Sequence, residues 1–127
     1  MAGDYTNKIF GATLVIPNAF STGNGQAAWI APCDCKLVYA AAGIETLGGT
    51  GETTSIMLRN DTDTVDLLAS TIEIAYNADP AVAAGTLTTT AAYLLIDSGD
   101  VIEVDVDGVC TGAAEAGLTV YLYLQGM

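Results

Sequence analysis

The sequence contains no histidine and only three basic residues, and both shortages limit its function. Without histidine, a nucleophilic triad of the usual form has no base. The 127 residues carry fifteen acidic side chains against Lys8, Lys36 and Arg59, so the formal net charge is −12. Nucleic acid and anionic membranes are both bound through basic surfaces. We therefore expect the chain to bind neither nucleic acid nor a membrane.

Long hydrophobic runs are also absent, although 51% of the residues are hydrophobic. No apolar stretch approaches the roughly 20 residues that span a bilayer as a helix. Residues 1–11, MAGDYTNKIFG, contain an acidic residue and no apolar region like that of a Sec signal peptide. We therefore expect synthesis in a cytoplasm and no export by that route.

The cysteines are few and odd in number: Cys33, Cys35 and Cys110. An odd count argues against a disulfide framework. The spacing of Cys33 and Cys35, with one residue between them, is shorter than in most structural zinc sites. We therefore predict buried or half-buried free thiols in a reducing compartment.

Short β-rich runs broken by Gly, Asn, Asp and Ser dominate the chain, and helical periodicity is missing. About eight strands are predicted, at residues 11–17, 27–32, 35–45, 53–60, 64–69, 71–76, 100–107 and 117–125. This pattern predicts an all-β, antiparallel, jelly-roll-like sandwich. We expect one domain over 11–127, with residues 1–10 as an N-terminal arm or tail. The Ala/Thr-rich segment 77–95 is predicted to be a long crossover loop, with a short helical turn in it as a further option.

The stretch SGDVIEVDVDG, residues 98–108, alternates strictly between aliphatic and acidic side chains. A strand would point Ile102, Val104 and Val106 inward and the three carboxylates of Glu103, Asp105 and Asp107 outward. Carboxylates spaced roughly 6–7 Å apart along one strand form a poor cage for a metal ion. We interpret the acidic column as a wall that faces water.

Two further stretches carry acidic residues in suggestive patterns. Residues 93–100, YLLIDSGD, resemble the active-site turn of aspartic proteases, but the family's later apolar-apolar-Gly-Arg element is missing. We interpret Asp97, Ser98 and Gly99 as a turn. Residues 60–66, NDTDTVD, resemble the start of an EF-hand loop. That loop should have glycine at its sixth position, where Asp66 stands, so a hairpin turn fits better, and a weak surface calcium site at Asp61, Asp63 or the column of Glu103, Asp105 and Asp107 remains open.

Aromatic residues are scarce, which limits carbohydrate chemistry. The single tryptophan, Trp29, is predicted to pack in the core or between the sheets. Tyr121 and Tyr123 alternate with aliphatic residues and should point outward, where tyrosines often cap a sheet edge or a subunit interface. With no catalytic constellation in view, we assign no catalytic, cofactor-binding or metal-ligating residue and expect no enzyme activity.

The centre and the end of the chain resemble the jelly-roll proteins that decorate or cement the capsids of tailed bacteriophages. The resemblance rests on residues 30–61, IAPCDCKLVYAAAGIETLGGTGETTSIMLRND, and on the closing elements SGDVIEVDVDG, TGAAEAG and LTVYLYLQ. It covers about two-thirds of the chain. Cys35 and Thr62 stand where the family pattern has a turn glycine.

This resemblance implies a structural virion protein, assembled as a homotrimer on the outer capsid surface, where it clamps neighbouring major capsid subunits. Assembly in the host cytoplasm would need no signal peptide, and an acidic exterior would keep particles dispersed. In such a shell protein, segment 77–95 is the first candidate for a contact surface. The alternative is a carbohydrate- or Ca²⁺-binding sandwich, lectin-like or part of a phage fibre, that uses Trp29, Tyr121 or Tyr123.

Overall fold

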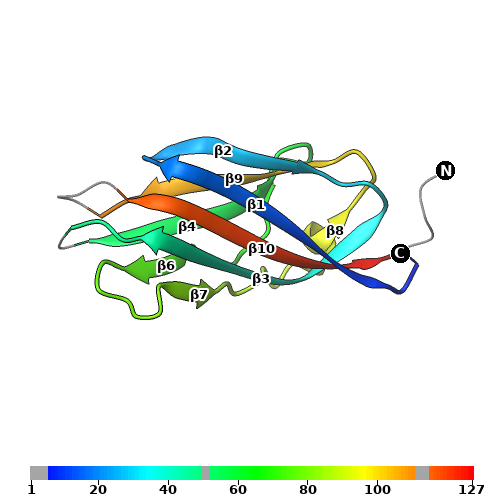
Figure 1. Ribbon diagram of the computed structural model, residues 1–127. Helices are drawn as coiled ribbons and strands as arrows, with labels where there is room; N and C mark the ends of the chain where they lie inside the picture. The colour runs from blue at the N-terminus through cyan, green and yellow to red at the C-terminus, as the bar shows by residue number, and fades with distance from the viewer. Residues whose placement is uncertain (1–5, 50–51, 111–114) are drawn as a thin grey trace.

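The computed structural model describes residues 6–49, 52–110 and 115–127, which form two antiparallel sheets packed face to face (Figure 1). Sheet A contains β1 (Ile9–Ala19), β3 (Cys35–Thr46), β7 (Val82–Ala84), β8 (Leu95–Ile96) and β10 (Ala116–Gly126). Sheet B contains β2 (Gly23–Ile30), β4 (Thr53–Asn60), β5 (Val65–Asp66), β6 (Ile72–Ala75) and β9 (Val101–Gly108). The predicted all-β sandwich is confirmed.

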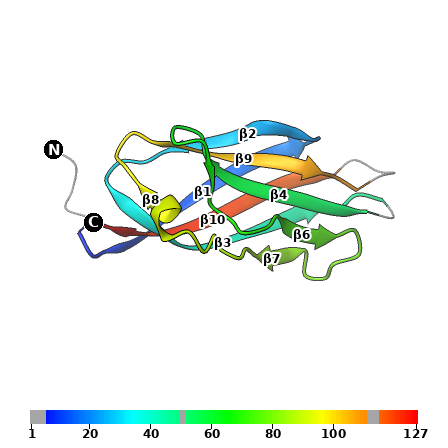
Figure 2. The same ribbon diagram turned by 180° about the vertical axis from the view of Figure 1, so that it is seen from behind.

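The first four strands and the last three alternate between the two sheets, whereas β4, β5 and β6 all belong to sheet B and β7 and β8 both belong to sheet A. The order is β1–β10–β3–β7 in sheet A, where β8 also pairs with β3. In sheet B it is β2–β9–β4–β5, where β6 also pairs with β4. The chain therefore crosses from one sheet to the other between β1 and β2, between β2 and β3, and between β3 and β4. Figure 2 shows sheet B from its own side, with β9 and β4 at its centre.

Period-two alternation along the central strands builds the core between the sheets. The inward residues of β10 and β9 are almost completely buried: Leu118, Val120, Leu122, Leu124, Ile102, Val104 and Val106. Between them along β10, Tyr121 and Tyr123 are exposed on the outer face. Burying an aliphatic side chain of this size stabilises the folded state by roughly 1.5–3 kcal/mol. The inward and outward assignments predicted for these two strands are therefore confirmed, with one exception described below.

The structure has ten strands in its described residues, where the sequence predicts about eight. The predicted strands 64–69 and 71–76 shrink to the short β5 and β6. The predicted crossover loop 77–95 contains a short helical turn, the four-residue 3-10 helix η1 (Ala91–Leu94), but it also supplies β7 and the first residue of β8, which the sequence does not predict. Both short strands pair with β3, which has twelve residues and thus room for two partners on one edge.

The start of the chain lies beside its end. Strand β1 begins at Ile9, and the backbone N–H of Asn7 donates a 2.8 Å hydrogen bond to the carbonyl of Gly126. Residues 1–5 of the expected N-terminal arm lie outside the described residues. Within the described part of the chain, no helix has the length and apolar character needed to span a membrane.

Candidate interaction surfaces

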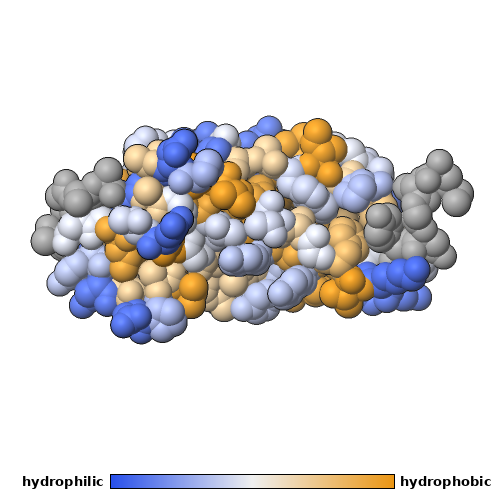
Figure 3. Space-filling view, in the orientation of Figure 1, coloured by the Kyte–Doolittle hydropathy of each residue, from blue (hydrophilic) through white to orange (hydrophobic). Residues whose placement is uncertain are grey.

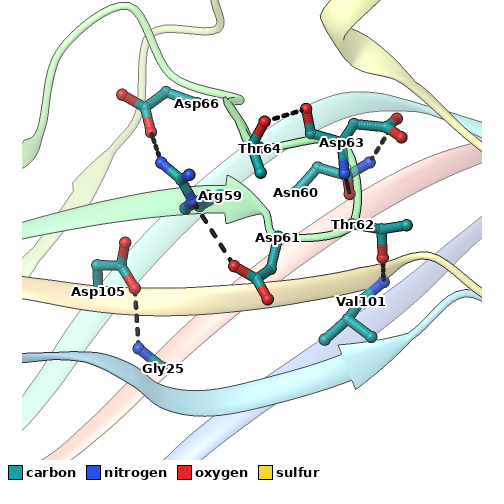
Figure 4. A network of polar contacts seen from close by, with 10 residues as sticks. All are labelled: Gly25, Arg59, Asn60, Asp61, Thr62, Asp63, Thr64, Asp66, Val101 and Asp105. Atoms are coloured by element: carbon teal, nitrogen blue, oxygen red, sulfur yellow. Dashed lines mark hydrogen bonds and ion pairs between the residues drawn. The ribbon is translucent and has the colours of Figure 1, made fainter.

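The outer face of sheet B carries the acidic column of β9. Glu103 is half-buried and Asp107 is exposed, but Asp105 is only 6% exposed. Its carboxylate accepts a 2.9 Å hydrogen bond from the backbone N–H of Gly25 in β2 (Figure 4). The pairing of β2 with β9 shifts register between Gly23 and Ala27, and this irregularity contains Gly25. The interpretation of the whole column as a wall facing water is therefore wrong at Asp105.

Desolvation and neighbouring carboxylates raise the pKa values of two carboxyl groups on this face, Glu103 and Asp107, and of Asp63 in the β4–β5 turn. Desolvation, followed by the charges of Asp105 and Asp61, raises the pKa of Glu103, and the Arg59 guanidinium opposes this shift. Desolvation and the charges of Asp105, Asp66 and Glu73 raise the pKa of Asp107. The same two effects, with Asp100 and Asp97 as the neighbours, raise the pKa of Asp63. Repulsion on this face is thus a cost of folding at neutral pH.

We predict that the melting temperature rises as the pH falls from about 7 to about 5. The folded state binds protons at Asp63, Glu103 and Asp107 more tightly than the unfolded state, because their folded pKa values are raised. Stability is therefore gained as the pH falls through those raised values and lost as it rises through them. Calorimetric scans at constant ionic strength measure this effect. High salt, or the double substitution Glu103→Gln and Asp107→Asn, should reduce the gain; a melting temperature that stays flat or falls over this range would contradict it.

Residues 60–66 and residues 93–100, the two acidic stretches with suggestive patterns, lie against each other. Asn60, at the end of β4, is fully buried, and its side-chain amide donates to the carboxylate of Asp100 at 2.9 Å. The same amide reaches Asp63 at 3.3 Å, and the Asn60 side-chain oxygen accepts from the Asp63 backbone N–H at 3.2 Å. Thr62 accepts a 2.9 Å bond from the Val101 backbone N–H (Figure 4). These bonds tie the β4–β5 turn to the entry of β9.

Both stretches, residues 60–66 and 93–100, contain turns, as predicted. Gly99 has a φ of +91° and the Asp100 N–H donates to the Asp97 carbonyl at 2.9 Å. The side chains that hold this turn are Asp100, which accepts from the Asp97 N–H, and Asp34, which accepts from the Ser98 N–H. Arg59 lies 3.8 Å from a carboxylate oxygen of Asp61 and from one of Asp66 (Figure 4).

A search of the described residues finds no group of three or more Cys, Asp or Glu side chains that could hold a metal ion. The carboxylates of the acidic stretches are instead engaged with an amide side chain, backbone N–H groups and Arg59. The outer face of sheet B therefore presents negative charge, spread over the sheet, to any partner.

The cysteines are free thiols, and Cys35 and Cys110 are buried. Desolvation, with a contribution from Cys33 and Asp34, raises the pKa of Cys35 to about 12. The Cys110 thiol donates to the Glu52 carbonyl at 3.0 Å, and burial raises its pKa. The prediction of buried or half-buried free thiols is confirmed.

A buried carboxylate, Glu115, lies next to Cys110 and is 1% exposed. It accepts a 2.6 Å hydrogen bond from the Cys110 backbone N–H and a further short bond from the hydroxyl of Thr54, which is fully buried. These bonds connect the start of β10 with β4 in the opposite sheet. The Glu115 carboxylate therefore stabilises the contact between the two sheets by hydrogen bonding.

The outer face of sheet A has the opposite character. Pairing of β1, β10, β3 and β7 places Thr13, Tyr121, Ala41 and Ala84 in one row and Val15, Thr119, Gly43 and Val82 in the next. Tyr123 stacks on Tyr39 with ring centroids 5.5 Å apart. In Figure 3, which views this side, pale and orange residues cover the middle, and strongly hydrophilic residues lie mainly toward the ends. This face is broad, aromatic and nearly free of charge.

A groove of about 340 Å³ crosses this face at the Glu45 end of β3. Its floor is open because Gly43 in β3 and Gly117 in β10 have no side chains, while Tyr121 and Val82 stand beside it. A Cβ on Gly117, which has a φ of +76°, would lie 2.6 Å from the Cβ of Glu45. Val82 belongs to segment 77–95, so part of that segment does border a surface hollow.

The aromatic residues proposed for sugar binding do not come together. Trp29 is half-buried and packs on Phe10 of the other sheet, with ring centroids 6.5 Å apart. This placement matches the prediction that Trp29 packs between the sheets. Tyr121 and Tyr123 both lie on the outer face of sheet A, and Trp29 belongs to sheet B. The structure therefore contains no platform that combines all three rings.

Comparisons with known proteins add a fold likeness. No protein-family model matches the sequence, and no curated protein matches it. A chain of the Cyanophage Pam1 capsid asymmetric unit is similar over 100% of this chain and 91% of that chain, with a TM-score of 0.65 and 11% identity. A chain of the capsid of Ralstonia phage GP4 is similar over 100% and 90%, with a TM-score of 0.65 and 13% identity. The shared feature is the fold.

A third likeness is to a chain of the acidic stable capsid structure of Helicobacter pylori bacteriophage KHP30. It covers 92% of this chain and 89% of that chain, with a TM-score of 0.57 and 14% identity. All three matches span nearly the whole of both chains, so the likeness is of complete domains.

Sequence reasoning missed the groove and the burial of Glu115. The groove depends on Gly43 and Gly117, which are far apart in the chain, lining the same hollow. A usable signal was present in the outward residues of 117–125 and 35–45, which include almost no charge in a chain of −12. In an acidic protein, such an uncharged strand face is itself a candidate contact surface.

Proposed function

We propose that this chain is a structural protein of a bacteriophage virion that decorates the outer capsid surface as a homotrimer and stabilises contacts between major capsid subunits. The observation that carries the proposal is the likeness of the complete chain to chains of three phage capsid structures. A fold can host many functions, so this support is one of analogy. It agrees with the resemblance carried by residues 30–61 and by the closing strands.

We further infer that the sandwich is a jelly roll. That fold is a double sheet of eight strands connected as two Greek keys. The order β1–β10–β3–β7 facing β2–β9–β4–β6 has this form when the short β5 and β8 are counted with their neighbours. The family resemblance in the sequence implies the same arrangement.

The two faces of the sandwich suit a role at a surface. The acidic outer face of sheet B, with Glu103, Asp107 and Glu73 at its surface, suits exposure to solvent on a crowded particle. The uncharged outer face of sheet A suits contact with protein. A carbohydrate-binding role has less support, because Trp29 packs on Phe10.

The test is binding to capsids of the phage that encodes the chain, prepared without it. We expect the purified protein to cosediment with these capsids at a fixed number of copies per capsid subunit and to raise their melting temperature. Excess of an unrelated acidic β-sandwich protein serves as the control. Absence of the chain from purified virions, together with no binding to capsids, would overturn the proposal.

A further inference from the structure

We propose that the outer face of sheet A docks onto a second copy of this chain, with the Lys36 end of one copy seated in the groove at the Glu45 end of the next. The inference deepens the proposed function, on whose homotrimer it rests, by naming the contact surface. It rests on the groove at one end of this face, on the exposed aliphatic side chains at the other end, and on the opposite charges of Glu45 and Lys36.

The Lys36 end presents exposed aliphatic side chains. Register across sheet A aligns Ile9, Gln125, Lys36 and Leu95 in one row. Ile9 is 61% exposed and Leu95 is 44% exposed, although both are aliphatic and lie in strands. Side chains of this kind leave water favourably when a partner covers them. This end therefore offers apolar side chains for insertion.

The Glu45 end presents the matching hollow. The groove of about 340 Å³ lies between Val15, Val82 and Tyr121, with glycine at its floor. A groove with an apolar and aromatic wall accepts aliphatic side chains, and tyrosine is enriched where interfaces contribute most to affinity. Ile9 or Leu95 of another copy has the chemistry to fill it.

Charge selects a second copy as the occupant. Lys36 lies in the row at one end of this face and Glu45 lines the groove at the other end, so the two charged residues stand at opposite ends of the same strand. A head-to-tail contact brings Lys36 of one copy toward Glu45 of the next, so the two ends of the face are complementary to each other. Elsewhere two copies of a chain with a net charge of −12 repel each other, and on this face repulsion is smallest.

A head-to-tail contact also has the symmetry that a trimer needs. An interface between two different patches closes into a ring when the rotation allows it, whereas a dimer about a twofold axis uses the same patch on both subunits. The exposed aliphatic side chains at the Lys36 end and the groove at the Glu45 end are different patches. Three such contacts would place every groove under a neighbouring subunit.

The experiment measures self-association of the full chain by sedimentation equilibrium and light scattering. Tyr121→Glu places a carboxylate at the groove, and Tyr76→Glu is the matched control, since Tyr76 is equally exposed (40% against 44%) and follows β6 of sheet B. We expect Tyr121→Glu to raise the dissociation constant at least about thirtyfold and Tyr76→Glu to change it less than about threefold. Circular dichroism verifies that both variants fold.

A charge exchange tests the head-to-tail geometry. Lys36→Glu and Glu45→Lys should each weaken association about tenfold, and the double variant should return to within about threefold of the wild type. Rescue in the double variant would support the proposed pairing of ends. Additive loss would overturn it.

The mass of the wild-type assembly separates this inference from the proposed function. A trimer that Tyr121→Glu disrupts supports both. A dimer with the same response to the variants supports the contact surface and overturns the homotrimer. A trimer whose dissociation constant is unchanged in every variant overturns the contact surface but leaves the homotrimer standing. A wild type that stays monomeric at about 100 µM overturns the contact surface, and capsid binding then decides the virion role separately.

Discussion

Replacing Glu115 with alanine is expected to destabilise the fold by about 3–5 kcal/mol. The substitution leaves two buried donors, the Thr54 hydroxyl and the Cys110 backbone N–H, without the carboxylate that accepts from both. Each buried donor without a partner costs about 1–3 kcal/mol, and the missing side chain adds a cavity. For a domain of this size, the melting temperature should fall by roughly 10–20 °C.

Urea unfolding followed by fluorescence and by circular dichroism measures this loss. Asp107→Ala is the matched control, because it removes an exposed carboxylate whose neighbours repel it, and it should leave stability unchanged or slightly higher. Glu115→Gln should cost less than Glu115→Ala, since an amide oxygen can still accept from Cys110. A double-mutant cycle with Thr54→Val should give a coupling energy above about 0.5 kcal/mol. A loss as small as that of the Asp107 control would contradict the structural place assigned to Glu115.

Glu115 illustrates which features sequence patterns reveal and which they hide. In the sequence it lies in TGAAEAG, a Gly-rich stretch that reads as a turn, and nothing nearby in the chain marks it as buried. Its burial follows from Thr54, which lies 61 residues away and in the other sheet. Patterns within one strand cannot report a partner brought in by topology.

The prediction that Asp105 faces water is wrong for the same reason: its partner comes from another strand. Strict alternation along 102–107 correctly predicts which side chains enter the core, because that period is a property of one strand. The burial of Asp105 on the outer face depends on an irregularity in β2, where the N–H of Gly25 reaches over it. A neighbouring strand thus changes the environment of a residue whose orientation is predicted correctly.

The strand count shows the limit of pattern reading at the edges of the sheets. The long central strands β3 and β10 are predicted within one or two residues of their observed ends. The two- and three-residue strands β7 and β8 exist because β3 offers them an edge, and their own residues lack a β pattern. Central strands carry their own hydrophobic signal, whereas short edge strands depend on the strand beside them.

Replacing Leu122 with alanine is expected to cost about 4 kcal/mol, toward the upper end of the range for such truncations. Leu122 is fully buried in β10, the central strand of sheet A, and its direct neighbours in register are Ala12 and Ala40. The variant would therefore place three alanines side by side in the core. Short neighbours cannot move into the cavity, and the cost of truncation rises with the volume that stays empty.

Two variants bracket that expectation. Leu122→Met keeps the volume and should cost less than about 1.5 kcal/mol. Thr119→Ala changes a half-buried residue of the outer row of the same strand and should lie within about 0.5 kcal/mol of the wild type. Urea unfolding measures all three at a low protein concentration at which each variant is monomeric, so that self-association does not contribute. If Leu122→Ala lost no more stability than Thr119→Ala, the inward assignment of β10 would be wrong, and with it the outer face on which the proposed contact between copies depends.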